Sequence, residues 1–334
     1  MKQVAAVALL LVLFFFLLPL VLFGGGSGGG EAPDGTPIPV LTPAPSGPLD
    51  TERTITVRQD GGTVETLSLG DYLWRVVAAE MPASFEEEAL KAQCVAARTY
   101  AMRRMANPPQ AHPDAAVCTD HTCCQAYITP EAAAANWGEQ ADYYTAKIKN
   151  AVSGTDGVVA LYDGALIDAV FFSSAAGRTV DAVEVWGNSV PYLTGVDSPE
   201  GEEVPNWRST VTVTPQEFRQ TFQAAHPEAV LEGDPSGWFG TPELDSAGGV
   251  RSLTVGGVTV SGGEMRTLFS LRSTHFTISA TEAEITFSVT GYGHGVGMSQ
   301  YGANALAKEG KTYEEILQWY YTGITLDTID TLAS

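Results

Sequence analysis

Residues 291–303 read GYGHGVGMSQYGA, and together with residues 76–82 (VVAAEMP) and 88–100 (EALKAQCVAARTY) they decide the fold of this chain. The alternating glycines of 291–303 let a backbone pass close to a neighbour or take positive φ angles. The segment opens a predicted helix over 297–309, whose free N–H groups suit a polar ligand. It lacks the lysine of a phosphate-binding loop. Taken alone, His294 is more typical of a structural hydrogen bond than of a catalyst.

The other two stretches place a carboxylate between two helices. Apolar spacing predicts a helix from Gly70 to Glu80, Pro82 interrupts it, and Ser84 with Glu87 fits a capping box for a second helix over 85–105. Glu80 follows small and apolar residues, and desolvation raises a carboxyl pKa, so Glu80 is a candidate general acid. The alternative is a surface glutamate at a helix end, a position that the helix dipole disfavours.

The N-terminus predicts a membrane anchor. Residues 4–23 form a run of 20 without charge, long enough to cross a bilayer, and Lys2 precedes it. The positive-inside rule then gives a cytoplasmic N-terminus and an extracytoplasmic remainder. A cleaved signal peptide is the alternative, although GGGSGGG follows in place of a small-residue cleavage site. We therefore expect a cytoplasmic tip and transmembrane anchor at 1–23, and a Gly/Pro-rich linker at 24–50.

The remainder, 51–334, is expected to form one large extracytoplasmic domain. Its pattern predicts an α+β fold with mixed helices and antiparallel sheets, including a hairpin around residues 60–62 and two helices near the C-terminus. The 44% apolar content excludes a disordered polyanion. With 39 acidic against 18 basic residues and a net charge of −21, nucleic acid is not an expected partner. No motif indicates an organic cofactor.

A loop at 106–128 collects side chains that ligate metals. Tetrahedral zinc takes cysteine and histidine in such crowding, and four protein ligands would make the metal structural. A disulfide from Cys118 to Cys123 or Cys124 is the alternative outside the cytoplasm, although it leaves the histidines unexplained. Cys94, on the apolar face of a helix, is expected to be a buried small hydrophobe. The candidate ligands are His112, Cys118, His121, Cys123 and Cys124.

Three motifs together resemble the stage II sporulation protein D (SpoIID) family. They are AAEMP with EALKAQCVAARTYA (78–101), FFSSAAGRT followed by Trp186 (171–186), and the nearly continuous GYGHGVGMSQYGANALAKEGKTYEEILQWYYTGITL (291–326). The similarity covers about residues 50–330. It implies a membrane-anchored lytic transglycosylase that remodels peptidoglycan during forespore engulfment, in the space between mother cell and forespore. Stage II sporulation proteins P and M are the implied partners.

The resemblance also implies site residues. Glu80, in the Glu-Met-Pro motif, is the implied catalytic acid/base, acting on MurNAc–GlcNAc bonds of glycan strands that we expect to be stripped of stem peptides. The matched motifs contain further residues expected to line the glycan groove or to fix its walls, and Lys91 among them is expected near Glu80. These residues are Lys91, Gln93, Arg98, Ser173, Ser174, His294, Ser299 and Gln300.

The resemblance also implies a metal site, because some members of the family hold zinc with two histidines and two cysteines. This chain has Cys123 where the second histidine would stand, so the implied set is His112, Cys118, Cys123 and Cys124, unless His121 replaces Cys123. Two other functions stay open. The same domain resembles amidase enhancers, which predicts a non-catalytic wall-binding protein that stimulates an N-acetylmuramoyl-L-alanine amidase. A zinc hydrolase using the 112–124 cluster is the third hypothesis.

Overall fold

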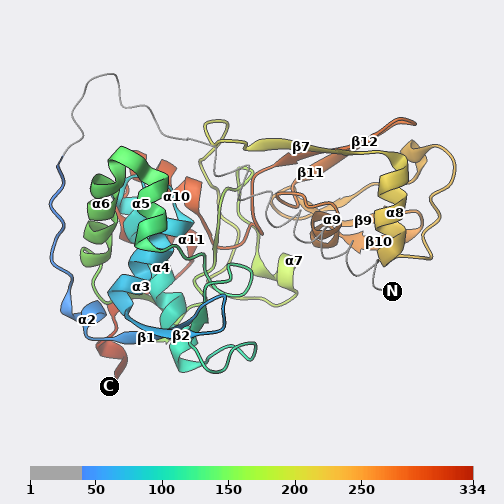
Figure 1. The fold of residues 1–334 in the computed structure, drawn as a ribbon. Coiled ribbons are helices and arrows are strands. Elements are labelled where there is room, and N and C mark those ends of the chain that lie inside the picture. The colour runs from blue at the N-terminus through green and yellow to red at the C-terminus, as the bar shows by residue number, and fades with distance from the viewer. Residues whose placement is uncertain (1–39, 334) are drawn as a thin grey trace.

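The computed structural model describes residues 40–333, which fold around two large hydrophobic cores, with a small third cluster of Val159, Leu161 and Ile329. Figure 1 shows the two large cores as two lobes: a helical lobe built from both ends of the described chain, and a β lobe formed by the segment between. The predicted anchor, residues 4–23, lies outside the described residues. Within 40–333, no helix combines the length and apolarity needed to span a bilayer.

The helical lobe is built around α4 (Glu87–Ala106). Ala89, Ala92, Ala96 and Ala97 are fully buried, and these small side chains let neighbouring helices approach from several sides. The helices packed against α4 are α3 (Leu69–Glu80), α6 (Ala141–Ser153), α10 (Gln300–Lys308) and α11 (Tyr313–Tyr320). A fifth helix, α5 (Pro130–Trp137), packs on α3 and α6.

Short sheets close the helical lobe. The predicted hairpin forms between β1 (Thr54–Arg58) and β2 (Val64–Ser68), and β3 (Val117–Cys118) adds to β1 in parallel. A second sheet has the order β14-β4-β5, where β4 is Val158–Tyr162, β5 is Ala165–Leu166 and β14 is Thr325–Thr328. A parallel pair, β6 (Phe171–Phe172) with β13 (Met298–Ser299), joins two of the sequence motifs.

The β lobe contains two three-stranded antiparallel sheets, which confirms the antiparallel part of the predicted fold class. One has the order β11-β12-β7 and the other β10-β9-β8. Phe218 of α8 stacks on Phe222 and Phe269 in the core between them. The elements are β7 (Arg208–Val213), α8 (Pro215–Ala225), β8 (Glu243–Leu244), β9 (Val250–Val255), β10 (Val258–Ser261), α9 (Gly262–Leu268), β11 (Phe276–Ala280) and β12 (Ile285–Thr290). The region expected as one domain therefore holds two cores.

Two local predictions were wrong. Helix α4 begins after Glu86 with no side-chain cap, so Ser84 and Glu87 form no capping box. Instead, the Glu86 N–H donates to Oδ1 of Asn304 in α10 at 2.8 Å, so a tertiary contact replaces the local cap. The predicted linker also ends earlier than residue 50. Residues Pro48–Thr51 form α2, and Asp50 is buried against α4.

Candidate active site and metal centre

Glu80 is the last residue of α3, and both of its carboxylate oxygens accept hydrogen bonds from other elements. The backbone N–H of Ala126 donates to Oε1 at 2.7 Å, and Nε2 of Gln300 donates to Oε2 at 3.3 Å. Helix α3 stops there because Met81 is extended and its side chain is buried. The carboxyl group is therefore held between the end of α3, the loop after the cysteines, and the start of α10.

Burial raises the pKa of the Glu80 carboxyl, as the sequence predicted. The hydrogen bonds from Ala126 and Gln300 and the nearby His121 lower the pKa and offset only part of this effect. Both donors are uncharged amides, so they orient the carboxyl without supplying a full positive charge. Glu80 therefore keeps its proton to higher pH than an exposed glutamate, which a general acid requires.

Gln300 is positioned by a buried network that the sequence did not reveal. Its neighbour Ser299, the N-cap of α10, donates a short hydrogen bond to Glu200. Glu200 is 3% exposed and also accepts from the Ala175 N–H and the Ser198 hydroxyl, each at 2.6 Å. Ser198 in turn bonds the Tyr320 hydroxyl at 2.7 Å. All of this fixes the first turn of α10, from which Gln300 reaches Glu80.

Glycine at position 302 makes this network possible. A Cβ there would lie 2.0 Å from the Tyr320 hydroxyl, 2.4 Å from Oγ of Ser198 and 2.6 Å from Oε2 of Glu200. Glu200 lies in a loop without periodicity, so no sequence pattern marks it. The one sequence signal for this network was Gly302 inside the predicted helix over 297–309, because a glycine within a helix often marks the close approach of another part of the chain.

His294 is held in its neutral form. Its Nε2 donates to the Phe171 carbonyl at 3.1 Å, and its Nδ1 accepts from the Val296 N–H at 3.2 Å. Burial lowers its pKa to about 4; the Phe171 bond opposes that shift and Arg266 adds to it. With both nitrogens engaged, His294 acts as the structural hydrogen-bonder that its sequence context suggested.

Among the described residues, none of the predicted groove residues on α4 forms a hydrogen bond or an ion pair with Glu80. The Lys91 ammonium binds Glu87 at 3.0 Å and Glu88 at 2.8 Å, both on its own helix. Arg98 is fully buried and makes a two-pronged ion pair with Asp50, with N–O distances of 2.6 and 2.8 Å. Burial excludes direct contact between Arg98 and the glycan. Of the two roles expected for this residue, lining the glycan groove or fixing its walls, only the second agrees with its position.

Gln93, on the same helix, is also fully buried, and neither atom of its amide has a hydrogen-bond partner among residues 40–333. Its position therefore excludes it from the groove surface as well.

Ser173 and Ser174 lie beside the glycine-rich motif. The Ser173 carbonyl accepts from the Tyr301 N–H at 3.0 Å, and Ser174 pairs with Tyr292 through two backbone hydrogen bonds of 3.0 and 2.8 Å. Ser174 is buried and Ser173 is partly buried. The structure thus brings these serines together with Ser299 and Gln300, whereas Lys91, Gln93 and Arg98 lie elsewhere on α4.

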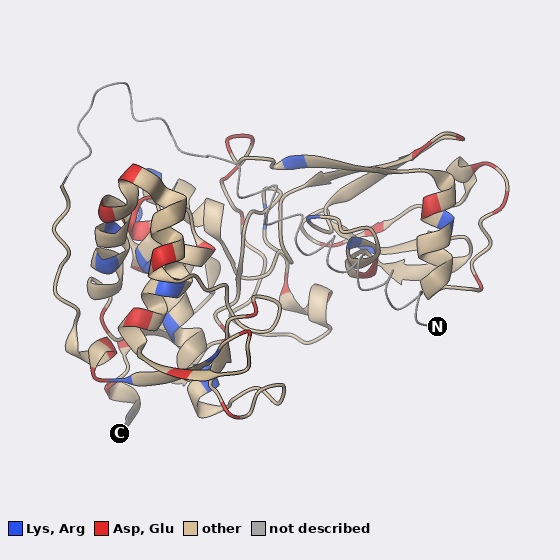
Figure 2. Cartoon of the chain, in the orientation of Figure 1, with Lys and Arg blue, Asp and Glu red and all other residues tan. Residues whose placement is uncertain are grey.

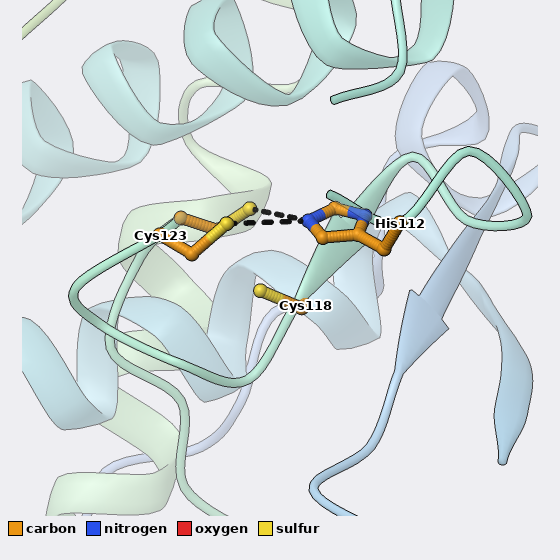
Figure 3. Close-up of side chains that lie close together, drawn as sticks. His112, Cys118 and Cys123 are labelled. Atoms are coloured by element: carbon orange, nitrogen blue, oxygen red, sulfur yellow. Dashed lines mark hydrogen bonds between the residues drawn. The ribbon is translucent and has the colours of Figure 1, made fainter. Parts of the chain in front are cut away.

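The cysteine loop forms a compact group of four ligand atoms. One atom each from His112, Cys118, Cys123 and Cys124 lies within 4.8 Å of all the others (Figure 3). His112 Nε2 is 3.5 Å from the Cys123 sulfur and 3.4 Å from the Cys124 sulfur. Tetrahedral zinc with these ligands has edges of about 3.5 Å. His112 Nδ1 contacts the Ala115 carbonyl at 3.1 Å, which leaves Nε2 free to ligate.

This geometry distinguishes between a metal site and a disulfide in the loop. All four cysteines are free, so the structure contains none of the proposed disulfides. His121 is exposed and outside the group, so the set is one histidine with three cysteines. Cys94 is fully buried in the core, as expected. The cluster could hold a metal ion with its four protein ligands, which leaves no open position for catalysis.

The metal cluster and Glu80 share one short connection. Cys124 is followed by Gln125, whose Oε1 accepts from the Tyr72 hydroxyl at 3.0 Å, and by Ala126, which donates to Glu80. Burial raises the pKa of Tyr72, and Cys124 and Glu80 raise it further, so this phenol lies between the two sites. The backbone donor for Glu80 thus lies two residues after Cys124 of the candidate metal cluster, a link that side-chain motifs do not reveal.

Comparison with known proteins agrees with these motifs. A family model described as stage II sporulation protein matches residues 58–162. Stage II sporulation protein D of Bacillus subtilis is 36% identical over 269 residues, covering 80% of this chain and 77% of that protein. The protein of the same name from Bacillus amyloliquefaciens is 35% identical over 280 residues, with 83% and 79% covered.

A further relative carries a different name. The amidase enhancer of Bacillus subtilis is 29% identical over 299 residues, which cover 75% of this chain but 39% of that protein. Identity above one third over four fifths of the chain, together with the family match, is decisive: the chain belongs to the stage II sporulation protein D family.

Proposed function

We propose that this chain is a lytic transglycosylase that cleaves the MurNAc–GlcNAc bonds of peptidoglycan, with Glu80 as its acid/base. Family membership supports a role in sporulation. The observation that carries the activity is the Glu80 carboxyl, whose pKa is raised by burial while two neutral amides orient it. A protonated, oriented carboxyl is what departure of a glycosidic oxygen requires.

One carboxyl is sufficient for this reaction. Protonated Glu80 gives its proton to the glycosidic oxygen as the C1–O bond breaks and an oxocarbenium-like centre forms. The resulting carboxylate takes the proton of the MurNAc C6 hydroxyl, whose oxygen bonds to C1 and closes a 1,6-anhydro ring. Glu80 regains its proton and no water is consumed.

Hydrolysis would instead require a second available carboxylate. The buried Glu200 already accepts three hydrogen bonds, and Glu87 and Glu88 bind Lys91. These contacts support a transglycosylase rather than a hydrolase.

The metal proposed for the His112 cluster is zinc, in a structural role. Three thiolates and an imidazole are ligands that zinc prefers, and His112 is oriented by its second nitrogen. The cluster would fix the loop that ends in Ala126, and so the backbone donor to Glu80. With four protein ligands, no position at the metal is open to water or substrate, which argues against the zinc-hydrolase alternative.

The setting we propose is the cell membrane, with residues 1–23 as a single anchor and the described domain outside the cytoplasm. There it would act during engulfment of the forespore, in the intermembrane space, together with stage II sporulation proteins P and M. Protease protection of the domain in sporulating cells, with and without permeabilisation, tests the orientation.

A second function is favoured by one comparison. The similarity to an amidase enhancer predicts that the chain binds glycan and stimulates a partner amidase without cutting. Digestion of stripped glycan strands by the purified full-length chain separates the alternatives. Anhydro-ended products support the transglycosylase, and products carrying added water identify a hydrolase. Binding without any product favours the enhancer.

A further inference from the structure

The connection from α3 to α4, residues 81–86, is held to α10 on both sides. Just before it, the Glu80 carboxylate accepts a hydrogen bond from Nε2 of Gln300 at 3.3 Å. At its end, the Glu86 N–H donates to Oδ1 of Asn304 at 2.8 Å. Helix α10 also packs along α4 in the helical lobe (Figure 1). Two amide side chains of one helix therefore hold the two ends of the segment that follows the candidate catalytic carboxyl.

The two amides share one face of α10. Gln300 and Asn304 are four residues apart, so one lies above the other on the helix surface. Both are buried, with exposed fractions of 6% and 7%. Between them, the ring of Tyr301 packs edge-on against the ring of Phe85, with the ring centres 4.9 Å apart. Three contacts thus fall within little more than one turn of α10, and a rigid helix cannot move at one of them without moving at the others.

The connection is also anchored away from α10. The side chains of Met81, Ala83 and Phe85 are buried in the core of the helical lobe. The Lys147 ammonium of α6 donates to the Phe85 carbonyl. Within the described part of the chain, no local side chain caps α4, so the acceptor on Asn304 is the polar contact that fixes the start of α4 to α10.

These three contacts carry no charge. Figure 2 shows acidic and basic positions on the helices of this lobe, but the contacts from α10 are made by two amides and a phenol ring. The Gln300 hydrogen bond lowers the pKa of the Glu80 carboxyl without a full positive charge, so the effect of burial still dominates. Loosening of that hydrogen bond should raise the pKa further and leave the carboxyl less well oriented.

We propose that Asn304 is a positioning residue for cleavage: it fixes α10 to the start of α4 and thereby holds Gln300 against the Glu80 carboxyl. This role rests on the proposed function and adds to it a residue that acts through Gln300. Misplacement of a catalytic group by about 1 Å can slow an enzyme about a hundredfold. A hydrogen bond one helical turn away from the catalytic contact can therefore affect the rate.

Kinetics of the full-length chain on stripped glycan strands test the effect on the rate. Asn304→Leu keeps the bulk of the side chain but removes the acceptor, so kcat should fall about tenfold while KM stays within about twofold. Asn304→Asp keeps an acceptor at the N-terminus of α4, where negative charge is favoured, so its kcat should stay near that of wild type. Thr214→Ala is the matched control. It removes the cap of α8 in the β lobe and should lower the melting temperature without changing kcat.

Titration of Glu80 shows whether Asn304 acts through Gln300. The carboxyl is followed by ¹³C NMR in chains with labelled glutamate, and its signal is the one that Glu80→Gln lacks. Gln300→Leu should raise the pKa of Glu80, and Asn304→Leu should raise it by loosening the same hydrogen bond. The double variant should show no larger shift than Gln300→Leu alone, because both changes act on one contact. His121 and Tyr72, the ionisable side chains that interact with Glu80 in the described part of the chain, stay in every variant.

An unchanged Glu80 pKa in Asn304→Leu, or shifts that add in the double variant, would overturn the positioning role. So would an Asn304→Asp variant as slow as Asn304→Leu, or a loss of kcat as large in Thr214→Ala. If Asn304→Leu does not fold, Asn304→Ser takes its place, because the serine hydroxyl is too short to reach the Glu86 N–H. A wild-type chain that cleaves nothing overturns the proposed function alone, since the titration of Glu80 is independent of cleavage.

Discussion

Glu80 combines a raised pKa with a place at a helix C-terminus, and both features disfavour its ionised form in the fold. Its proton stabilises the folded state most at low pH, and that contribution is lost as pH rises through the raised folded pKa. Cleavage that depends on the protonated form should therefore decline over the same rise in pH. A pH–rate profile of wild type checks this; a rate that keeps increasing through alkaline pH would contradict it.

Glu80→Gln should show the corresponding effect on stability. Glutamine preserves the shape but carries no charge, so the variant should gain about 1 kcal/mol of unfolding free energy at pH 8, a typical stability gain at an active site. The gain should vanish at pH 4, where Glu80 of the wild type is protonated. Urea denaturation at both pH values measures it. A variant that is less stable than wild type at pH 8 would mean that Glu80 is a structural anion.

The buried ion pair of Arg98 and Asp50 is a further feature of individual residues. It is expected to contribute to stability and not to catalysis. Asp50→Asn leaves the guanidinium without its counterion, which should cost about 3–5 kcal/mol. Replacing both residues, Asp50→Leu with Arg98→Met, should cost less than the single change because no charge remains buried. Chemical denaturation of the two variants makes the comparison. Equal losses would show that the ion pair is not what holds α2 to α4.

At the scale of elements, Glu200 fixes the first turn of α10, and from this turn Gln300 reaches the Glu80 carboxyl. Gly302→Ala would push a methyl group into the Tyr320, Ser198 and Glu200 network, and overpacking of this kind costs about 1–3 kcal/mol. Because the same turn carries Gln300, cleavage should fall as well. Gly263→Ala is the matched control: it lies in α9, where a Cβ would meet Oγ of Ser261 at an ordinary van der Waals distance of 3.8 Å, and it should stabilise by up to about 1 kcal/mol. Gly302→Ala with unchanged melting temperature and activity would remove the network from the account.

The predictions from the sequence agreed best with the structure for individual helices and strands. Local periodicity and turn signals predicted α3, α10, α11 and the β1–β2 hairpin, because these signals lie within each segment. Glu80 and the cluster of His112, Cys118, Cys123 and Cys124 could be selected as candidates from the sequence, because their residue types indicate acid/base chemistry and metal binding. Glu200 and Ala126 were not predicted. Glu200 depends on a loop without periodicity, and the role of Ala126 is played by a backbone N–H, which any residue supplies. For Arg98, motif membership did not distinguish between direct contact with the glycan and a buried ion pair that supports the structure.

At the scale of the whole molecule, the two cores separate the metal loop from the β lobe. The zinc proposal predicts one metal ion per chain and a cluster that stabilises the helical lobe. Cys118→Ser should weaken zinc binding more than about tenfold and lower the melting temperature. His121→Ala removes an exposed histidine outside the cluster and should do neither. Elemental analysis with thermal unfolding checks both variants. Metal loss in His121→Ala but not in Cys118→Ser would contradict the ligand set.

The central claim is that Glu80 performs transglycosylation without water. Stripped glycan strands are digested in ¹⁸O-labelled water by wild type, Glu80→Gln and Glu88→Gln, and the products are weighed by mass spectrometry. The account predicts that wild type releases unlabelled products, about 20 Da lighter than products hydrolysed by ¹⁸O-labelled water, and that Glu80→Gln releases them at least about a hundredfold more slowly. Glu88→Gln, which removes a carboxylate bound to Lys91, should still yield unlabelled anhydro products. Products that carry ¹⁸O, or full activity in Glu80→Gln, would contradict the account.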